Sequence, residues 1–133
     1  MAGITKIKVL LKEMRPVLDT TDYVFSMKEC SKIEKDIIAL DPIATFLESE
    51  GMTVVVTKAN ADKHKLSYDA VFNKITLEVH SSLEAVGLTA AISTALASND
   101  ISANVIAGYY HDHIFVPKDK ANLGLVILEG LTK

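Results

Sequence analysis

The order of local sequence patterns in the first half of this 133-residue chain recurs in its second half. Alternation of apolar and polar residues predicts a strand at residues 23–27 and another at residues 75–79. In each half, this strand is followed by a helix, by further strand pattern and by a second helix. Units of the order strand, helix, strand, strand, helix, strand fold as an antiparallel sheet with its helices on one face. We therefore predict an α+β fold of two ferredoxin-like units, residues 1–68 and 69–133.

Prolines and helix caps bound the elements of the first half. Pro16 ends an amphipathic helix, and Asp41 followed by Pro42 has the N-cap and first-turn proline of a second helix. Residues 29–36 are charged and irregular, which indicates a loop. In order, the patterns predict a helix over 4–14, a strand from 22, a short helix over 41–51, a strand over 52–57 and a short helix over 59–66.

The second half contains the clearest helix signal of the chain. Ser81 with Glu84 three residues later forms a capping box before an apolar helix over 83–97. The other patterns predict a strand over 71–80, strands over 103–109 and 113–116 joined by a turn at His111 and Asp112, and a last helix after Pro117. No last strand follows this helix. We expect that sheet edge to be open or to be covered by the first half or by a second chain, and an open edge favours a homodimer.

Composition excludes several classes of partner. The net charge of −3, with acidic and basic residues mixed along the chain, gives no basic stripe for nucleic acid. The longest weakly charged stretch, residues 83–97, is too short and too polar to span a bilayer, so no membrane association is expected. Cys30 is the single cysteine, which fits a reducing, cytoplasmic location. Gly124 and Gly130 are isolated, so no dinucleotide motif is present and no cofactor is expected.

Three segments resemble the ACT-domain family, in particular the small bacterial proteins with two tandem ACT-like units, whose second unit is related to the CASTOR amino-acid sensors. These segments are HSSLEAVGLTAA at 80–91, NDISANV at 99–105 and YYHDHIFVP at 109–117, and DPIATF at 41–46 and FNKITL at 72–77 extend the resemblance into the first half. The resemblance implies a regulatory fold without catalysis. It also implies a small ligand, commonly an amino acid, bound where the loop entering the first helix of a unit meets the neighbouring unit.

The expected ligand site lies at the start of the helix predicted from residue 83. Free backbone amides at a helix start attract a carboxylate. Glu84 is available for an ammonium group, although capping is its simpler role, and Gly87 indicates close approach of either a ligand or the sheet. The expected ligand-binding residues are His80, Ser81, Ser82, Leu83, Glu84, Ala85, Val86 and Gly87, and the family resemblance adds Asn104 and Val105 on the strand expected beside this loop.

Two kinds of catalytic chemistry compete with ligand binding. His111, Asp112 and His113, with His80 as a further nitrogen, have the residue types of a zinc or iron site, but no fourth ligand is identifiable and a polar hairpin turn explains them more simply. Ser81 beside His80 lacks the sequence context of a nucleophile. We therefore expect no metal and no catalytic residue. The function hypotheses are, in order, an amino-acid sensor, a structural or protein-interaction module, and a metal-dependent enzyme.

Overall fold

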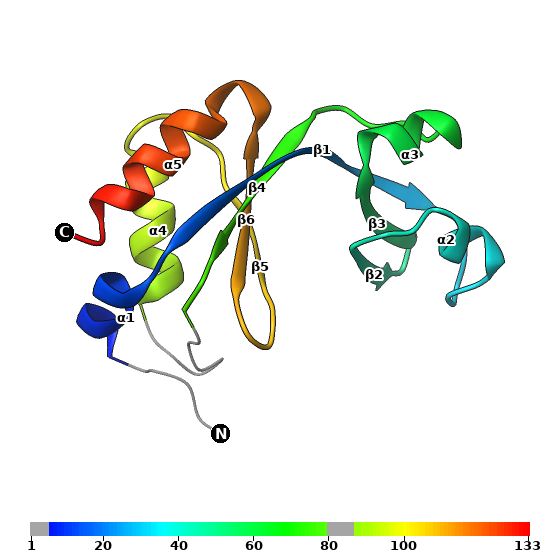
Figure 1. Ribbon diagram of the computed structural model, residues 1–133. Coiled ribbons are helices and arrows are strands. Elements are labelled where there is room, and N and C mark those ends of the chain that lie inside the picture. Colours follow the sequence, from blue (N-terminus) through cyan, green and yellow to red (C-terminus); the bar gives the residue numbers. More distant parts are fainter. Residues whose placement is uncertain (1–5, 80–86) are drawn as a thin grey trace. The chain divides into compact units, whose positions relative to one another are not determined.

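A computed structural model describes residues 6–79 and 87–133 of the chain. Helices are interspersed among single strands and pairs of strands along it (Figure 1). The elements are α1 (Ile7–Glu13), β1 (Pro16–Lys28), α2 (Lys35–Ala39), β2 (Ala44–Glu48), β3 (Gly51–Thr57), α3 (Lys58–Lys63), β4 (Phe72–Leu77), α4 (Leu88–Ala97), β5 (Asn104–Ala107), β6 (Asp112–Pro117), a 3-10 turn (Lys118–Lys120) and α5 (Ala121–Gly130). The α+β class is confirmed.

The strands follow the order β2-β3-β1-β4-β6-β5 in one six-stranded sheet. The pairs β1–β3, β2–β3 and β5–β6 are antiparallel. Read separately, β2-β3-β1-β4 and β1-β4-β6-β5 each have the strand order of a four-stranded ferredoxin-like sheet. The strand that the second half lacks is therefore β1, so the expectation that the first half covers this edge is confirmed.

The chain forms two compact units by its internal contacts. Unit 1 comprises Met1–Thr20 and Asn73–Lys133, and unit 2 comprises Thr21–Phe72. β1 contributes residues to both units, which is why this grouping differs from a division at the middle of the sequence. The repeat boundary between residues 68 and 69 stays a prediction about the tandem units.

Unit 1 packs helices α1, α4 and α5 on one face of its strands (Figure 1). Along β4, Ile75 and Leu77 are fully buried while Lys74 and Thr76 are half-buried, so the predicted alternation is confirmed. Fully buried side chains of this core are Leu10, Ile75, Leu77, Leu96, Ile114, Val116 and Leu128. None of the helices in residues 6–79 and 87–133 has the length and apolar character needed to cross a membrane.

Unit 2 has a separate core between α2, α3 and its strands. Val24, Ile37 and Val54 are buried in this core. Gly51 makes the tight turn between β2 and β3 possible, because its φ is 147° and an added Cβ would lie 2.7 Å from the backbone oxygen of Lys28.

The prediction of a helix over 41–51 is wrong, because residues Ala44–Glu48 form β2. The helix is instead α2, which begins at Lys35 inside the stretch that was expected to be irregular and ends before Leu40. Asp41 follows this helix in the left-handed conformation, with a φ of 49° and its N–H donated to the Ile38 carbonyl at 3.0 Å. Aspartate tolerates this conformation better than most residues, so Asp41 marks a helix end where an N-cap was expected.

In the second half, the helices and strands occur as expected but two boundaries move. α4 begins at Leu88, five residues after the predicted start, and Ser81 and Glu84 of the predicted capping box lie outside the described residues. The β5–β6 turn comprises residues 108–111, closed by the Gly108 N–H donated to the His111 carbonyl at 2.9 Å. Asp112 is therefore the first residue of a strand, where a turn residue was expected.

Candidate functional site

One end of unit 1 is formed by the last residue of β4 and the first residues of α4. Gly87 is the N-cap of α4, and its carbonyl accepts the first intrahelical hydrogen bond, from the Ala91 N–H at 2.9 Å. Because glycine has no side chain, the cap residue offers no acceptor to the first amides of the helix. Such amides, at the positive end of the helix dipole, attract an anion.

The position of Gly87 corrects the expectation that it lies one turn inside the helix. Its φ is 99°, which side-chain-bearing residues rarely adopt. The nearest atom to an added Cβ is in Ile7 of α1, at an ordinary contact distance of 3.8 Å. The left-handed backbone therefore requires glycine here, and tight packing on the sheet does not.

The β5–β6 hairpin turns back at this same end of unit 1 (Figure 1). The hydroxyl of Thr76, the next-to-last residue of β4, lies 2.9 Å from Nδ1 of His113, near the start of β6. Alternation along β6 places Asp112 on the face of Ile114 and Val116, which lie in the core beneath the helices. Asp112 therefore points to the helix-covered side of the sheet, at the end where α4 begins.

Burial perturbs the titratable groups of this hairpin. Asp112 is only 8% exposed, and burial raises its pKa above the ordinary value of 3.8. The charge of His111 has a smaller, opposite effect on this pKa. Nδ1 of His111 is buried and has no hydrogen-bond partner among the described residues. Burial, followed by the charges of Lys74 and His111, lowers the pKa of His113 below 6.5. The lowered pKa favours the neutral form of His113, whose Nδ1 shares a hydrogen bond with the Thr76 hydroxyl.

The predicted ligand residues are only partly within the described chain. His80, Ser81, Ser82, Leu83, Glu84, Ala85 and Val86 lie outside it. Asn104 and Val105 begin β5, beyond the C-terminal end of α4, whose ten residues span about 15 Å (Figure 1). Asn104 is exposed opposite Phe115, and Val105 packs on the unit 1 core. Unit 1 therefore does not bring Asn104 and Val105 together with Gly87.

The turn predicted at His111 and Asp112 is found at residues 108–111, and the burial of Asp112 is not anticipated by it. The sequence signal for the burial of Asp112 is the spacing of Asp112, Ile114 and Val116, which follows strand alternation. Within residues 6–79 and 87–133, no group of three or more His, Cys, Asp or Glu residues is arranged to hold a metal ion. His80, the further nitrogen of the metal hypothesis, lies outside these residues.

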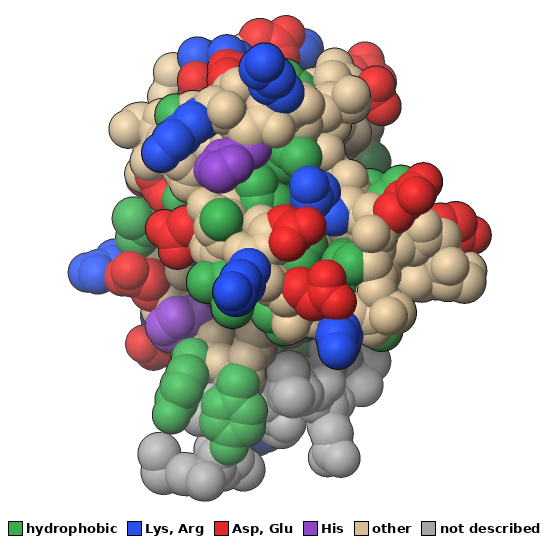
Figure 2. Space-filling model, turned by 90° about the vertical axis from the view of Figure 1, so that its right-hand side faces the viewer, with side chains coloured by type: hydrophobic (Ala, Val, Ile, Leu, Met, Phe, Trp, Pro, Cys, Tyr) green, Lys and Arg blue, Asp and Glu red, His purple; other side chains and the backbone are tan. Residues whose placement is uncertain are grey.

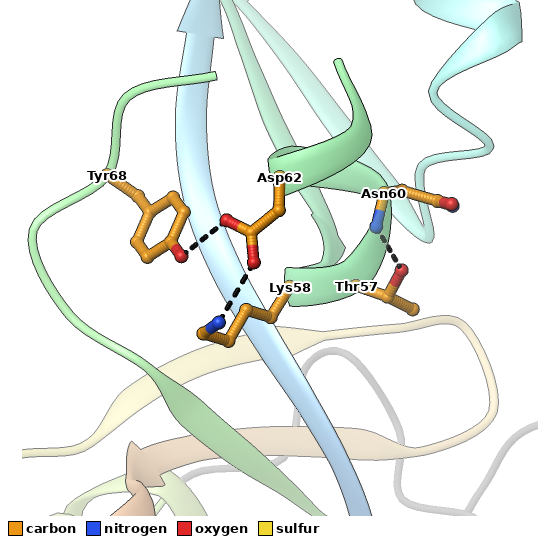
Figure 3. Close-up of polar contacts among 5 residues, drawn as sticks. All are labelled: Thr57, Lys58, Asn60, Asp62 and Tyr68. Atoms are coloured by element: carbon orange, nitrogen blue, oxygen red, sulfur yellow. Dashed lines mark hydrogen bonds and ion pairs between the residues drawn. The ribbon is translucent and has the colours of Figure 1, made fainter. Parts of the chain in front are cut away.

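A second polar cluster lies in unit 2, where Asp62 accepts two hydrogen bonds (Figure 3). Nζ of Lys58 donates to Asp62 at 2.9 Å and the Tyr68 hydroxyl donates to it at 2.7 Å. These bonds, that of Lys58 first, lower the pKa of Asp62, and Asp62 raises the pKa of both partners. Thr57 caps α3 by accepting the Asn60 N–H at 3.2 Å. The cluster joins α3 to the segment that follows it.

Open surface cavities lie within single units of the described part of the chain. One of about 380 Å³ adjoins the Asp62 cluster, at Thr21, Asp22, Thr57, Lys58, Ala59 and Asp62. Another, of about 360 Å³, is lined mainly by apolar residues of the α2–β2 segment, and a third, of about 390 Å³, lies beside Lys8 and Lys12 of α1. On the face drawn in Figure 2, acidic and basic side chains are interspersed, so that face has no continuous basic patch.

Two family models, both described as ACT domain, match the chain in tandem, one over residues 2–73 and the other over residues 71–129. The chain belongs to the ACT-domain family. No curated protein is significantly similar to it. Among solved structures, this ACT-domain protein is similar to a Vibrio cholerae protein of unknown function titled a possible transport protein. The two share 49% identity with a TM-score of 0.86, over 99% of this chain and 100% of that one.

More distant structures share the fold of this ACT-domain protein. An Agrobacterium tumefaciens protein is 11% identical with a TM-score of 0.73, over 90% of this chain and 89% of that one. The ligand-free regulatory subunit of aspartate kinase from Thermus thermophilus is 11% identical with a TM-score of 0.62, over 89% of this chain and 97% of that one. At such identities the likeness establishes the fold alone.

Proposed function

We propose that this ACT-domain protein is a regulatory protein without catalytic activity that binds a small zwitterion, most simply an amino acid. The proposal rests on one observation, the tandem match of two ACT-domain models over residues 2–129. The fold shared with a subunit described as regulatory supports it. A cytoplasmic location is part of the proposal.

The start of α4 is the proposed place for the ligand. Its first amides have no side-chain acceptor on Gly87 and are suited to a carboxylate. Residues 80–86, which precede Gly87, complete the proposed loop. Asn104 lies beyond the other end of α4, so its participation requires a second unit. The proposal therefore includes a homodimer in which the loop of one copy meets β5 of the other.

A thermal-denaturation screen with each of the twenty amino acids tests the proposal. Ligand at 100 times its dissociation constant adds about 2.7 kcal/mol to the free energy of unfolding, which raises Tm by roughly 10 °C in a domain of this size. We expect one amino acid, or a few related ones, to give such a shift. N-acetylated amino acids at equal concentration are the control for non-specific solute effects. Tm values unchanged by all twenty compounds would contradict the proposal.

A protein-interaction module is the second candidate, because unit 2 exposes large apolar side chains. Ile38 of α2 is 67% exposed, and Phe46 and Leu47 of β2 are 72% and 51% exposed. Large exposed apolar side chains are found at protein–protein contacts. This candidate predicts a specific protein partner and no Tm shift with any amino acid.

A further inference from the structure

Large exposed apolar side chains of the described chain are concentrated in one part of unit 2. Of the twelve such side chains in residues 6–79 and 87–133, five lie between residues 33 and 47, and each of the five is at least 46% exposed. They make up the α2–β2 surface: Ile33, Ile38, Ile43, Phe46 and Leu47. Exposed apolar groups gathered in this way mark an interaction site, so we expect a partner to cover this surface.

The α2–β2 surface combines an apolar recess with an open sheet edge. The recess is the cavity of about 360 Å³, which Ile33, Ile38 and Ile43 line together. Residues of β2 also line it, and β2 is the outermost strand, with β3 as its only strand neighbour in the described chain. Residues 44–47 of β2 contain no charge and no proline, the features that usually keep another strand from an edge. An extended segment can therefore pair with β2 and place a side chain in the recess.

The pairing of β2 with β3 determines which side chains an added strand would contact. Leu47 lies opposite Met52, which belongs to the unit 2 core, so Leu47 faces the helix-covered side of the sheet. Phe46 is adjacent to it and faces the other side. An added strand would therefore find an apolar contact on each face of the sheet.

The charge of this part of the chain specifies the kind of partner. Residues 29–50 contain six acidic and two basic residues, a net charge of −4, whereas the whole chain has a net charge of −3. The six acidic residues are all exposed: Glu29, Glu34, Asp36, Asp41, Glu48 and Glu50. None of them forms an ion pair with another described residue, and Asp41 lines the recess itself. Such a surface attracts a basic segment, and repulsion opposes its pairing with the same surface of a second copy.

We propose that the edge of β2 and the adjoining recess bind an extended, positively charged segment of another protein that also carries apolar side chains. The inference rests on the second candidate function and adds to it the class of partner. It does not depend on an amino acid at the start of α4, because α4 belongs to unit 1 and the α2–β2 surface belongs to unit 2.

Selection of peptides of about twelve residues from a random library displayed on phage, with the wild-type chain as the target, supplies the probe. We expect the enriched peptides to have a net positive charge and apolar residues. The most enriched peptide is then synthesised and titrated by fluorescence anisotropy, and its Kd should rise roughly fivefold between about 0.05 M and about 0.3 M NaCl, since salt screens opposite charges. An absence of enrichment, or enriched peptides with a net negative charge, would overturn the inference.

Leu47→Lys tests the edge, because it replaces an apolar contact by a charge that repels a basic peptide. Val126→Lys, at an exposed apolar residue of α5 in unit 1, is the matched control. We expect Leu47→Lys to weaken binding of the selected peptide at least tenfold and Val126→Lys to leave it within twofold. Ile38→Ser tests the recess without adding a charge and should weaken binding roughly fivefold. All three side chains are exposed, so the variants should keep the wild-type circular dichroism spectrum.

Peptide affinities of Leu47→Lys and Ile38→Ser that both lie within twofold of wild type would overturn the inference. Loss of a wild-type homodimer in Leu47→Lys would also overturn it, because that result would place a second copy at this edge. A negative amino-acid screen with intact peptide binding would contradict the amino-acid proposal alone, so the two failures are distinguishable.

Discussion

Gly87 has a positive φ at the point where the chain enters α4, and its identity follows from that backbone conformation. From the sequence, Gly87 indicates close approach of either a ligand or the sheet, because the predicted helix begins earlier. Asp112 is the converse case, since strand alternation was visible in the sequence but the burial of its carboxyl was not. Burial depends on which helices cover the strand, and local spacing does not contain that information.

Gly87→Ala is expected to lower the free energy of unfolding by about 1–2 kcal/mol, because alanine is strained in the left-handed region. Urea denaturation followed by circular dichroism measures this change. Gly130→Ala, at the end of α5, is the matched control, since no atom lies within 4 Å of its added Cβ. Alanine should be neutral there or stabilise the helix by up to about 1 kcal/mol. Equal losses in the two variants would argue against a backbone origin.

At the scale of elements, the sequence predicts those whose pattern is long and regular. β3, β4 and α5 were predicted because alternation or helical spacing continues through several residues. α2 has only five residues, too few for a helical period to appear, and the Asp41–Pro42 pair occurs both before helices and after them. The Asp41–Pro42 pair is therefore an ambiguous signal, because it fits both the start and the end of a helix.

The outer strand β5 gives the element-scale prediction, because it has an unpaired edge and an exposed Asn104 in the described chain. We expect the wild-type chain to sediment with about twice its mass of 14.5 kDa. Asn104→Lys should weaken this self-association at least tenfold, since it places a charge on the edge. Val126→Lys, at a residue of α5 that is 63% exposed, is the control and should sediment like wild type. A monomeric wild-type chain would contradict the homodimer.

At the scale of the whole molecule, the repeat in the sequence predicts two ACT-type units but does not reveal which strand completes the second one. The strand order shows that β1 lies between β3 and β4. Strand pairing across some fifty residues of chain is set by the global packing and has no local signature. For the same reason, the family resemblance placed Asn104 beside the ligand loop, whereas unit 1 alone keeps it beyond the far end of α4.

The most direct test of the account is an NMR titration of ¹⁵N-labelled wild-type protein with the amino acid that gives the largest thermal shift. Among residues 6–79 and 87–133, we predict the largest amide shift changes at Gly87 and Leu88, where the start of α4 would hold the carboxylate of the ligand. Largest changes at Lys58 and Asp62 of unit 2 would contradict the account, as would a spectrum that does not respond.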